Sequence, residues 1–156
     1  MNYQQIIRSQ YLSTLEMLKQ AIEKCPETLW NDPTDKNKFW QVAYHALYYT
    51  HLYLQPAEKD FRPWDKHRAE TDLAETGAPY SKDEILEYLA FCQQQVKEQV
   101  PHLNLDAESG FYWLPFDKAE LQVYNIRHVQ QHAGELMERL GSRTGIEVDW
   151  VGRKHE

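Results

Sequence analysis

Apolar residues recur at helical spacing in four stretches of the chain. In the first stretch, residues 3–24, they fall at intervals of three and four positions, and the following Pro26 ends the helix. The second stretch, residues 36–54, stops before Pro56 and is apolar or aromatic on nearly every side. A helix without a polar face must be covered on more than one side, so we expect a long loop or a second subunit against it.

The other two stretches lie in the C-terminal half. Ser81 and Glu84 form a capping-box pattern, which predicts a helix from residue 81 to about residue 100. Asp117 caps a fourth predicted helix, which extends to Leu140 and ends at Gly141. Between the second and third helices, residues 56–80 contain three prolines and mixed charges, and they are expected to be irregular.

Four amphipathic helices predict an all-α fold, a four-helix bundle formed by residues 1–141. Residues 142–156 are expected to form a loose tail. The connection of about 25 residues between helices two and three is long enough to cross the whole bundle, at ~3.3 Å per extended residue. An up-down-down-up arrangement with this long crossover is therefore expected.

Composition narrows the range of functions. The formal net charge of −7 repels phosphate backbones, so we expect no nucleic acid partner. The longest stretch without charge, residues 39–55, is short for a membrane span, and residues 1–10 do not resemble a signal peptide. We therefore expect a cytoplasmic protein without a membrane partner. Cys25 and Cys92 form no C-x-x-C motif and are expected to be reduced structural thiols.

Histidines supply the candidate chemistry. His128 and His132 are four positions apart, so both rings lie on one face of the fourth helix and can bind one metal ion. His45 lies in the middle of the most apolar helix, where a buried imidazole needs hydrogen-bond partners or a metal. The alternative from the residues alone is a hydrogen-bonded core His45 beside a surface pair. Glu135, two turns after His128, is expected to be solvated.

The remaining histidines are assigned no metal. His51 lies about 120° from His45 on the helical wheel and should point elsewhere. His67, His102 and His155 fall in loops or at helix ends, and we expect them to be solvated.

Two segments carry a family resemblance. The stretch FWQVAYHALYY, residues 39–49, resembles the second-helix signature of the DinB-like (damage-inducible) proteins, and YNIRHVQQHAGEL, residues 124–136, is similar to their last bundle helix. The helix order, the long crossover and the aromatic loop of residues 110–116 also fit. The resemblance implies that His45, His128 and His132 bind one divalent transition metal. Zinc or nickel is expected, and imidazole ligands also suit iron or copper.

The resemblance also suggests functions. The wider superfamily includes metal-dependent transferases that use a low-molecular-weight thiol, so a thiol cosubstrate and a small-molecule substrate are expected, with the aromatic loop, Tyr48 and Tyr49 shaping the pocket. No catalytic acid or base can be named. Alternatives are a metal-dependent hydrolase and a non-catalytic protein in which the ion has a structural or sensor role. DNA repair rests on the family's name alone and conflicts with the charge. The family commonly dimerises, which predicts a homodimer through the apolar second helix.

Overall fold

A computed structural model describes residues 1–68 and 78–156 of the chain. Within these residues all regular structure is helical, apart from one isolated bridge between Glu108 and Asp117. The prediction of an all-α fold is therefore confirmed. Four long helices, the one-turn α2 and two 3-10 turns follow in the order α1 (Tyr3–Lys24), α2 (Glu27–Trp30), α3 (Phe39–Tyr53), η1 (Glu58–Asp60), α4 (Lys82–Gln99), η2 (Val100–His102) and α5 (Lys118–Thr144).

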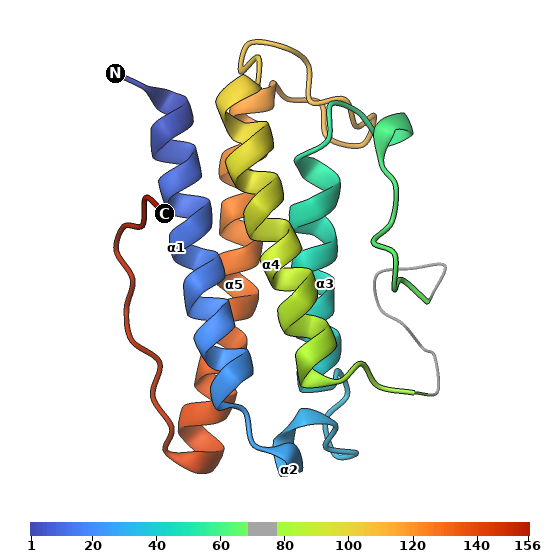
Figure 1. Cartoon of the computed structure of the whole chain (residues 1–156), viewed down its shortest axis with the longest axis vertical. Helices are drawn as coiled ribbons and strands as arrows, with labels where there is room; N and C mark the ends of the chain where they lie inside the picture. The colour runs from blue at the N-terminus through green and yellow to red at the C-terminus, as the bar shows by residue number, and fades with distance from the viewer. Residues whose placement is uncertain (69–77) are drawn as a thin grey trace.

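The long helices lie side by side, as Figure 1 shows. In that view α1 and α5 run downward, whereas α3 and α4 run upward, and the segment after α3 returns along the outside of the bundle. The helices α1 and α3 each pack mainly against α4 and α5, and they contact each other only a little. Consequently α3 and α5 are neighbours, which brings the segment around His45 beside the segment around His128.

The core consists mostly of aliphatic and tyrosine side chains from all four long helices. The helices therefore bury their apolar stripes against one another, as helical periodicity requires. The largest side chains that are almost completely buried are Tyr11, Leu12, Leu15, Met17, Leu18, Ile22, Phe39, Tyr44, Leu47, Leu54, Tyr80 and Tyr88.

Two of the predicted caps are present. The Ser81 hydroxyl accepts a hydrogen bond from the Glu84 amide, and the Glu84 carboxylate accepts one from the Ser81 amide at 2.8 Å. Asp117 accepts from the Glu120 amide at 2.8 Å and begins α5. These bonds satisfy amides that have no partner inside their own helices.

The boundaries of α3 and α5 differ from the prediction. The helix α3 begins at Phe39 instead of residue 36, because Lys38 is its N-cap and the Gln41 side chain accepts from the Lys38 amide at 2.8 Å. The helix α5 continues through Gly141 to Thr144. Gly145, with a φ of 71°, supplies the left-handed residue that ends it.

The C-terminal segment after Gly145 is not the loose tail that we expected. It runs back along α1 towards the N-terminal end of that helix (Figure 1). Lys24 donates to the Glu147 carbonyl at 2.8 Å, and Lys154 forms an ion pair with Glu16 at 2.6 Å. Hydrogen bonds along most of α1 therefore hold the segment in place.

The connection between α3 and α4 covers the outer side of α3. The rings of Phe61 and His67 lie against Tyr48, with ring centroids 5.3 and 5.4 Å apart. Trp64 stacks on Tyr88 of α4 at 4.6 Å. The long loop thus accounts for the apolar outer side of α3. The part of the predicted irregular connection at residues 69–77 lies outside the described residues.

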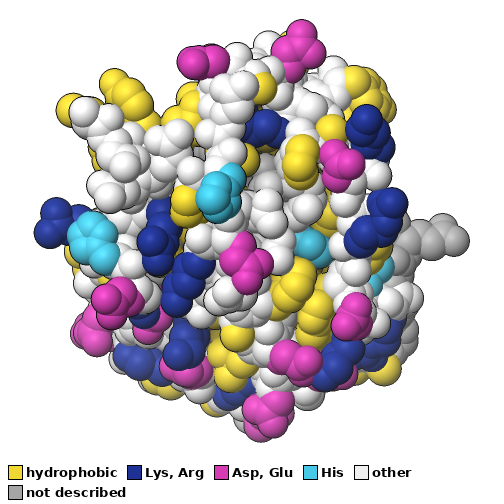
Figure 2. Space-filling model, turned by 45° about the horizontal axis from the view of Figure 1, so that its top comes forward, with side chains coloured by type: hydrophobic (Ala, Val, Ile, Leu, Met, Phe, Trp, Pro, Cys, Tyr) yellow, Lys and Arg dark blue, Asp and Glu magenta, His cyan; other side chains and the backbone are white. Residues whose placement is uncertain are grey.

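The surface mixes charges of both signs. Figure 2 shows acidic, basic and histidine side chains interspersed over one face of the molecule. Among residues 1–68 and 78–156, no helix combines the length and the apolarity that crossing a bilayer requires.

Candidate metal centre

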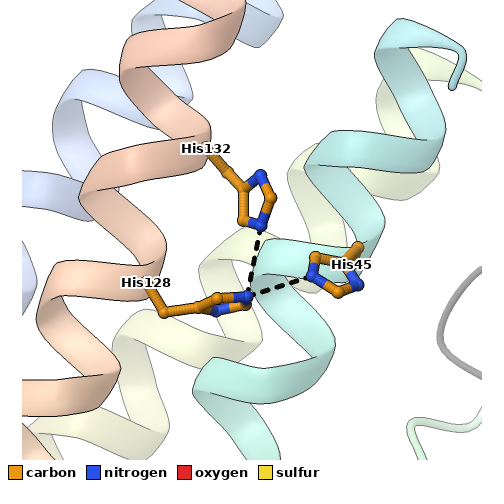
Figure 3. A group of neighbouring side chains, drawn as sticks. All are labelled: His45, His128 and His132. Atoms are coloured by element: carbon orange, nitrogen blue, oxygen red, sulfur yellow. Dashed lines mark hydrogen bonds between the residues drawn. The ribbon is translucent and has the colours of Figure 1, made fainter.

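The three predicted histidines meet between α3 and α5. His45 projects from the middle of α3, while His128 and His132 project from successive turns of α5 (Figure 3). All three are half-buried. The helical spacing of the pair and the pairing of α3 with α5 therefore place three imidazoles at one point.

The ring nitrogens converge on His128. Its Nε2 lies 3.0 Å from Nε2 of His45 and 3.2 Å from Nε2 of His132, the two contacts that are dashed in Figure 3. One nitrogen of each ring lies within 4.8 Å of the other two. Among the described residues, this is the group of histidine, cysteine and acidic side chains that is close enough to hold one metal ion.

This geometry fits a transition metal. Two nitrogens bound to one tetrahedral ion at ~2.0–2.1 Å lie roughly 3.3 Å apart, close to the two distances around His128. Three Nε2 atoms at one point are poorly matched to one another, because each contact needs a proton on one side and a lone pair on the other. A cation satisfies three lone pairs together. The donor set therefore fits zinc, nickel, iron or copper.

Glu135 contacts one of the three rings. Its Oε2 lies 3.0 Å from Nδ1 of His132, on the side of the ring away from the other histidines. A carboxylate accepts, so Nδ1 carries the proton and Nε2 presents its lone pair to the group. Glu135 is exposed, as the sequence predicted, but its contact with His132 was not predicted. The signal was its position three residues after His132, which puts both side chains on one face of α5.

Tyrosine rings adjoin the group. Tyr49 lies edge-on to His45 and His128, with ring centroids 5.0 and 5.4 Å apart. It also contacts Tyr53, which in turn packs against Phe111 at 5.0 Å. A continuous row of aromatic rings thus connects the histidines with the aromatic loop that the sequence singled out.

The aromatic loop has an anchor that sequence reasoning missed. Lys118, only 4% exposed, donates to the carbonyls of Pro56, at 2.9 Å, and of Ser109. Burial lowers the pKa of its ammonium group. Because these carbonyls are bound by one cation, the loop is fixed to the end of α3.

The other histidines differ in their surroundings. His51 points away from the metal candidates, as predicted, and its Nδ1 lies 3.1 Å from the Tyr88 hydroxyl of α4. Burial lowers its pKa to about 4. His67 is not simply solvated, because its ring stacks on Tyr44 at 5.8 Å and its Nδ1 bonds the Tyr44 hydroxyl. His102 and His155 are exposed, as expected.

Comparison with known proteins identifies the family of the chain. No curated protein and no solved structure has a significant match to the chain. The sequence model of the DinB superfamily matches residues 10–136, a range that includes His45, His128 and His132. Because this match covers most of the sequence, the chain belongs to the DinB superfamily.

Proposed function

We propose that this up-down-down-up four-helix bundle binds one divalent transition metal through His45, His128 and His132. The observation that carries the proposal is the convergence of their Nε2 atoms, 3.0 and 3.2 Å apart around His128. Zinc or nickel is the metal that we propose, and iron or copper is compatible with the same ligands. The superfamily membership and the half-buried position of the group support this assignment.

We further propose that the protein is a metal-dependent transferase for a low-molecular-weight thiol. A divalent ion held by three neutral nitrogens keeps a coordination position open and lowers the pKa of a thiol bound there. Tyr49 supplies an apolar wall beside His45 and His128, and Tyr53 and the loop at Phe111 support it from behind. These rings limit the access of water on that side of the group and offer a surface for an organic substrate.

Thiol binding can be tested with cobalt, whose spectrum responds to its ligands. Protein loaded with Co²⁺ should gain a sulfur-to-metal charge-transfer band when glutathione or another small thiol is added. Incubation with the thiol and an aryl halide or an epoxide should then yield the thioether, detected by mass spectrometry. The control is His102→Ala, which removes an exposed histidine outside the group of three and should behave like the wild type.

The same preparation separates the alternatives. Cleavage of esters or amides, without any thioether formed, would indicate a hydrolase. The absence of turnover with every substrate, together with a large rise in melting temperature on metal addition, would assign the ion a structural or sensor role. Either result would overturn the transferase proposal and leave the metal proposal standing.

A further inference from the structure

Glu135 is itself held in position. Its other carboxylate oxygen, Oε1, lies 3.4 Å from Nη2 of Arg139, one turn further along α5. The other arm of the same guanidinium, Nη1, lies 3.3 Å from Oδ2 of Asp35 and donates to the Asn37 carbonyl at 2.9 Å. One planar group therefore joins Glu135 to the segment between α2 and α3.

The network is most buried at Asp35, the end that lies furthest from the histidines. The side chain of Asp35 is 7% exposed and that of Arg139 is 13% exposed, against 41% for Glu135. Asp35 also pairs with Arg143 of the last turn of α5. An ion pair away from water, with both partners hydrogen-bonded, holds its geometry better than a solvated pair of long side chains.

We propose that Glu135 is the positioning residue for His132, and that Arg139 and Asp35 keep Glu135 in place. A carboxylate on Nδ1 fixes the ring's tautomer and orientation and makes Nε2 a stronger ligand. His132, Glu135 and Arg139 follow one another at intervals of three and four positions, so one face of α5 carries the whole network. The inference rests on the proposed metal function, although its hydrogen bonds can be tested without metal.

The network also couples the metal to a distant segment. Asp35 lies in the connection between α2 and α3, and its contact with Arg139 links that connection to Glu135 and so to His132. Coupling between two sites is reciprocal, so metal binding should protect the amides near Asp35 from hydrogen exchange. A change at Arg139 should weaken metal binding although Arg139 contacts none of the three histidines in the network described.

The first test reads the tautomer of His132 in metal-free protein. ¹⁵N NMR of the histidine rings at about pH 8 should place the His132 proton on Nδ1. Glu135→Ala should move it, at least in part, to Nε2. The control is Glu138→Ala, which removes an exposed carboxylate of the same helix and should leave the His132 signals unchanged. Unaltered His132 signals in Glu135→Ala would overturn the proposal.

The second test measures zinc affinity by competition with a chromophoric chelator. Glu135→Ala should weaken binding by about 10- to 100-fold, and Glu138→Ala by less than about twofold. Arg139→Gln should weaken it by about three- to tenfold. Arg143→Gln is the matched control, because Arg143 also pairs with Asp35 but has no contact with Glu135 in the described structure.

The outcomes are distinguishable. Equal losses of affinity in Arg139→Gln and Arg143→Gln would mean that general destabilisation, not the link to Glu135, is responsible, and the proposal would fail. Wild-type affinity in Glu135→Ala would contradict it directly. If neither the wild-type protein nor any variant binds zinc, but the tautomer of His132 still depends on Glu135, the proposed metal function fails while the positioning contact stands.

Discussion

His45 and His51 lie six residues apart on α3 and have different surroundings. His45 faces α5 and two other imidazoles, whereas His51 faces α4 and is only 4% exposed. The hydroxyl of Tyr88 lies against Nδ1 of His51, and burial raises the pKa of Tyr88, which keeps that hydroxyl protonated. Burial also lowers the pKa of His51, so neither partner of this hydrogen bond is charged near neutral pH. One helix thus buries one histidine against α4 and places another beside two imidazoles of α5.

The lowered pKa of His51 predicts a dependence of stability on pH. The neutral form is favoured in the folded protein, where the pKa is about 4, relative to 6.5 in the unfolded chain. The contribution of His51 to the free energy of unfolding is fully present above about pH 6.5 and is lost as the pH falls towards 4. In metal-free protein, the free energy of unfolding in urea should drop by about 2 kcal/mol between pH 7.5 and pH 5 from this group.

Variants isolate that contribution. His51→Gln, which does not titrate, should remove most of the loss over this pH range, while His102→Gln should retain it because His102 is exposed. The groove beside His51 is lined by charged groups of both signs, Asp60, Arg62, Asp65 and Glu87, and desolvation is the cause of the downward shift in its pKa. An identical pH dependence in both variants would refute the assignment to His51.

At the scale of helices and loops, the helices could be predicted from the sequence better than the loops that pack over them. The stripes and the caps at Ser81 and Asp117 were readable because each depends on a few local residues. The stop at Gly141 was misread, because a glycine ends a helix only where the backbone turns left-handed, which happens at Gly145. The contacts of His67 were not predictable from local sequence, since they depend on where the long connection folds back.

Substitutions of two glycines probe the aromatic loop and the helix α5. Gly110, at a φ of +87°, begins the aromatic loop, and a Cβ there would lie 2.3 Å from the Pro56 carbonyl oxygen. Gly110→Ala should therefore lower the free energy of unfolding by about 3 kcal/mol. Gly134 lies inside α5, where an added methyl group would meet nothing within 4 Å, and Gly134→Ala should raise stability by about 0.5–1 kcal/mol. Urea denaturation measures both, and a neutral Gly110→Ala would contradict the close approach of the loop to Pro56.

For the whole molecule, the homodimer stays a prediction. The apolar outer side of α3 suggested a second subunit, but the connection around Phe61, Trp64 and His67 covers that side within one chain. We still expect a dimer from the superfamily resemblance. Light scattering at high protein concentration should give twice the mass of the 18.6 kDa chain, and a monomer there would refute the prediction.

The meeting of α3 and α5 could be anticipated only in part from the sequence. The spacing of His128 and His132 guarantees a shared face, but nothing local brings His45 to them. That requires α3 and α5 to be neighbours, a property of the complete bundle. The family resemblance supplied this long-range information. The contact of Arg139 with Asp35 likewise depends on where the segment before α3 lies, whereas the contact of Glu135 with His132 is local to α5.

The most direct test of the account is the metal content of the purified protein. Elemental analysis should find about one divalent transition metal per chain, and His45→Ala, His128→Ala or His132→Ala should each lose most of it. His102→Ala should retain the wild-type content, provided that all variants keep the helical circular dichroism of the parent. Metal-free wild-type protein that also fails to bind added zinc or nickel would contradict the central claim.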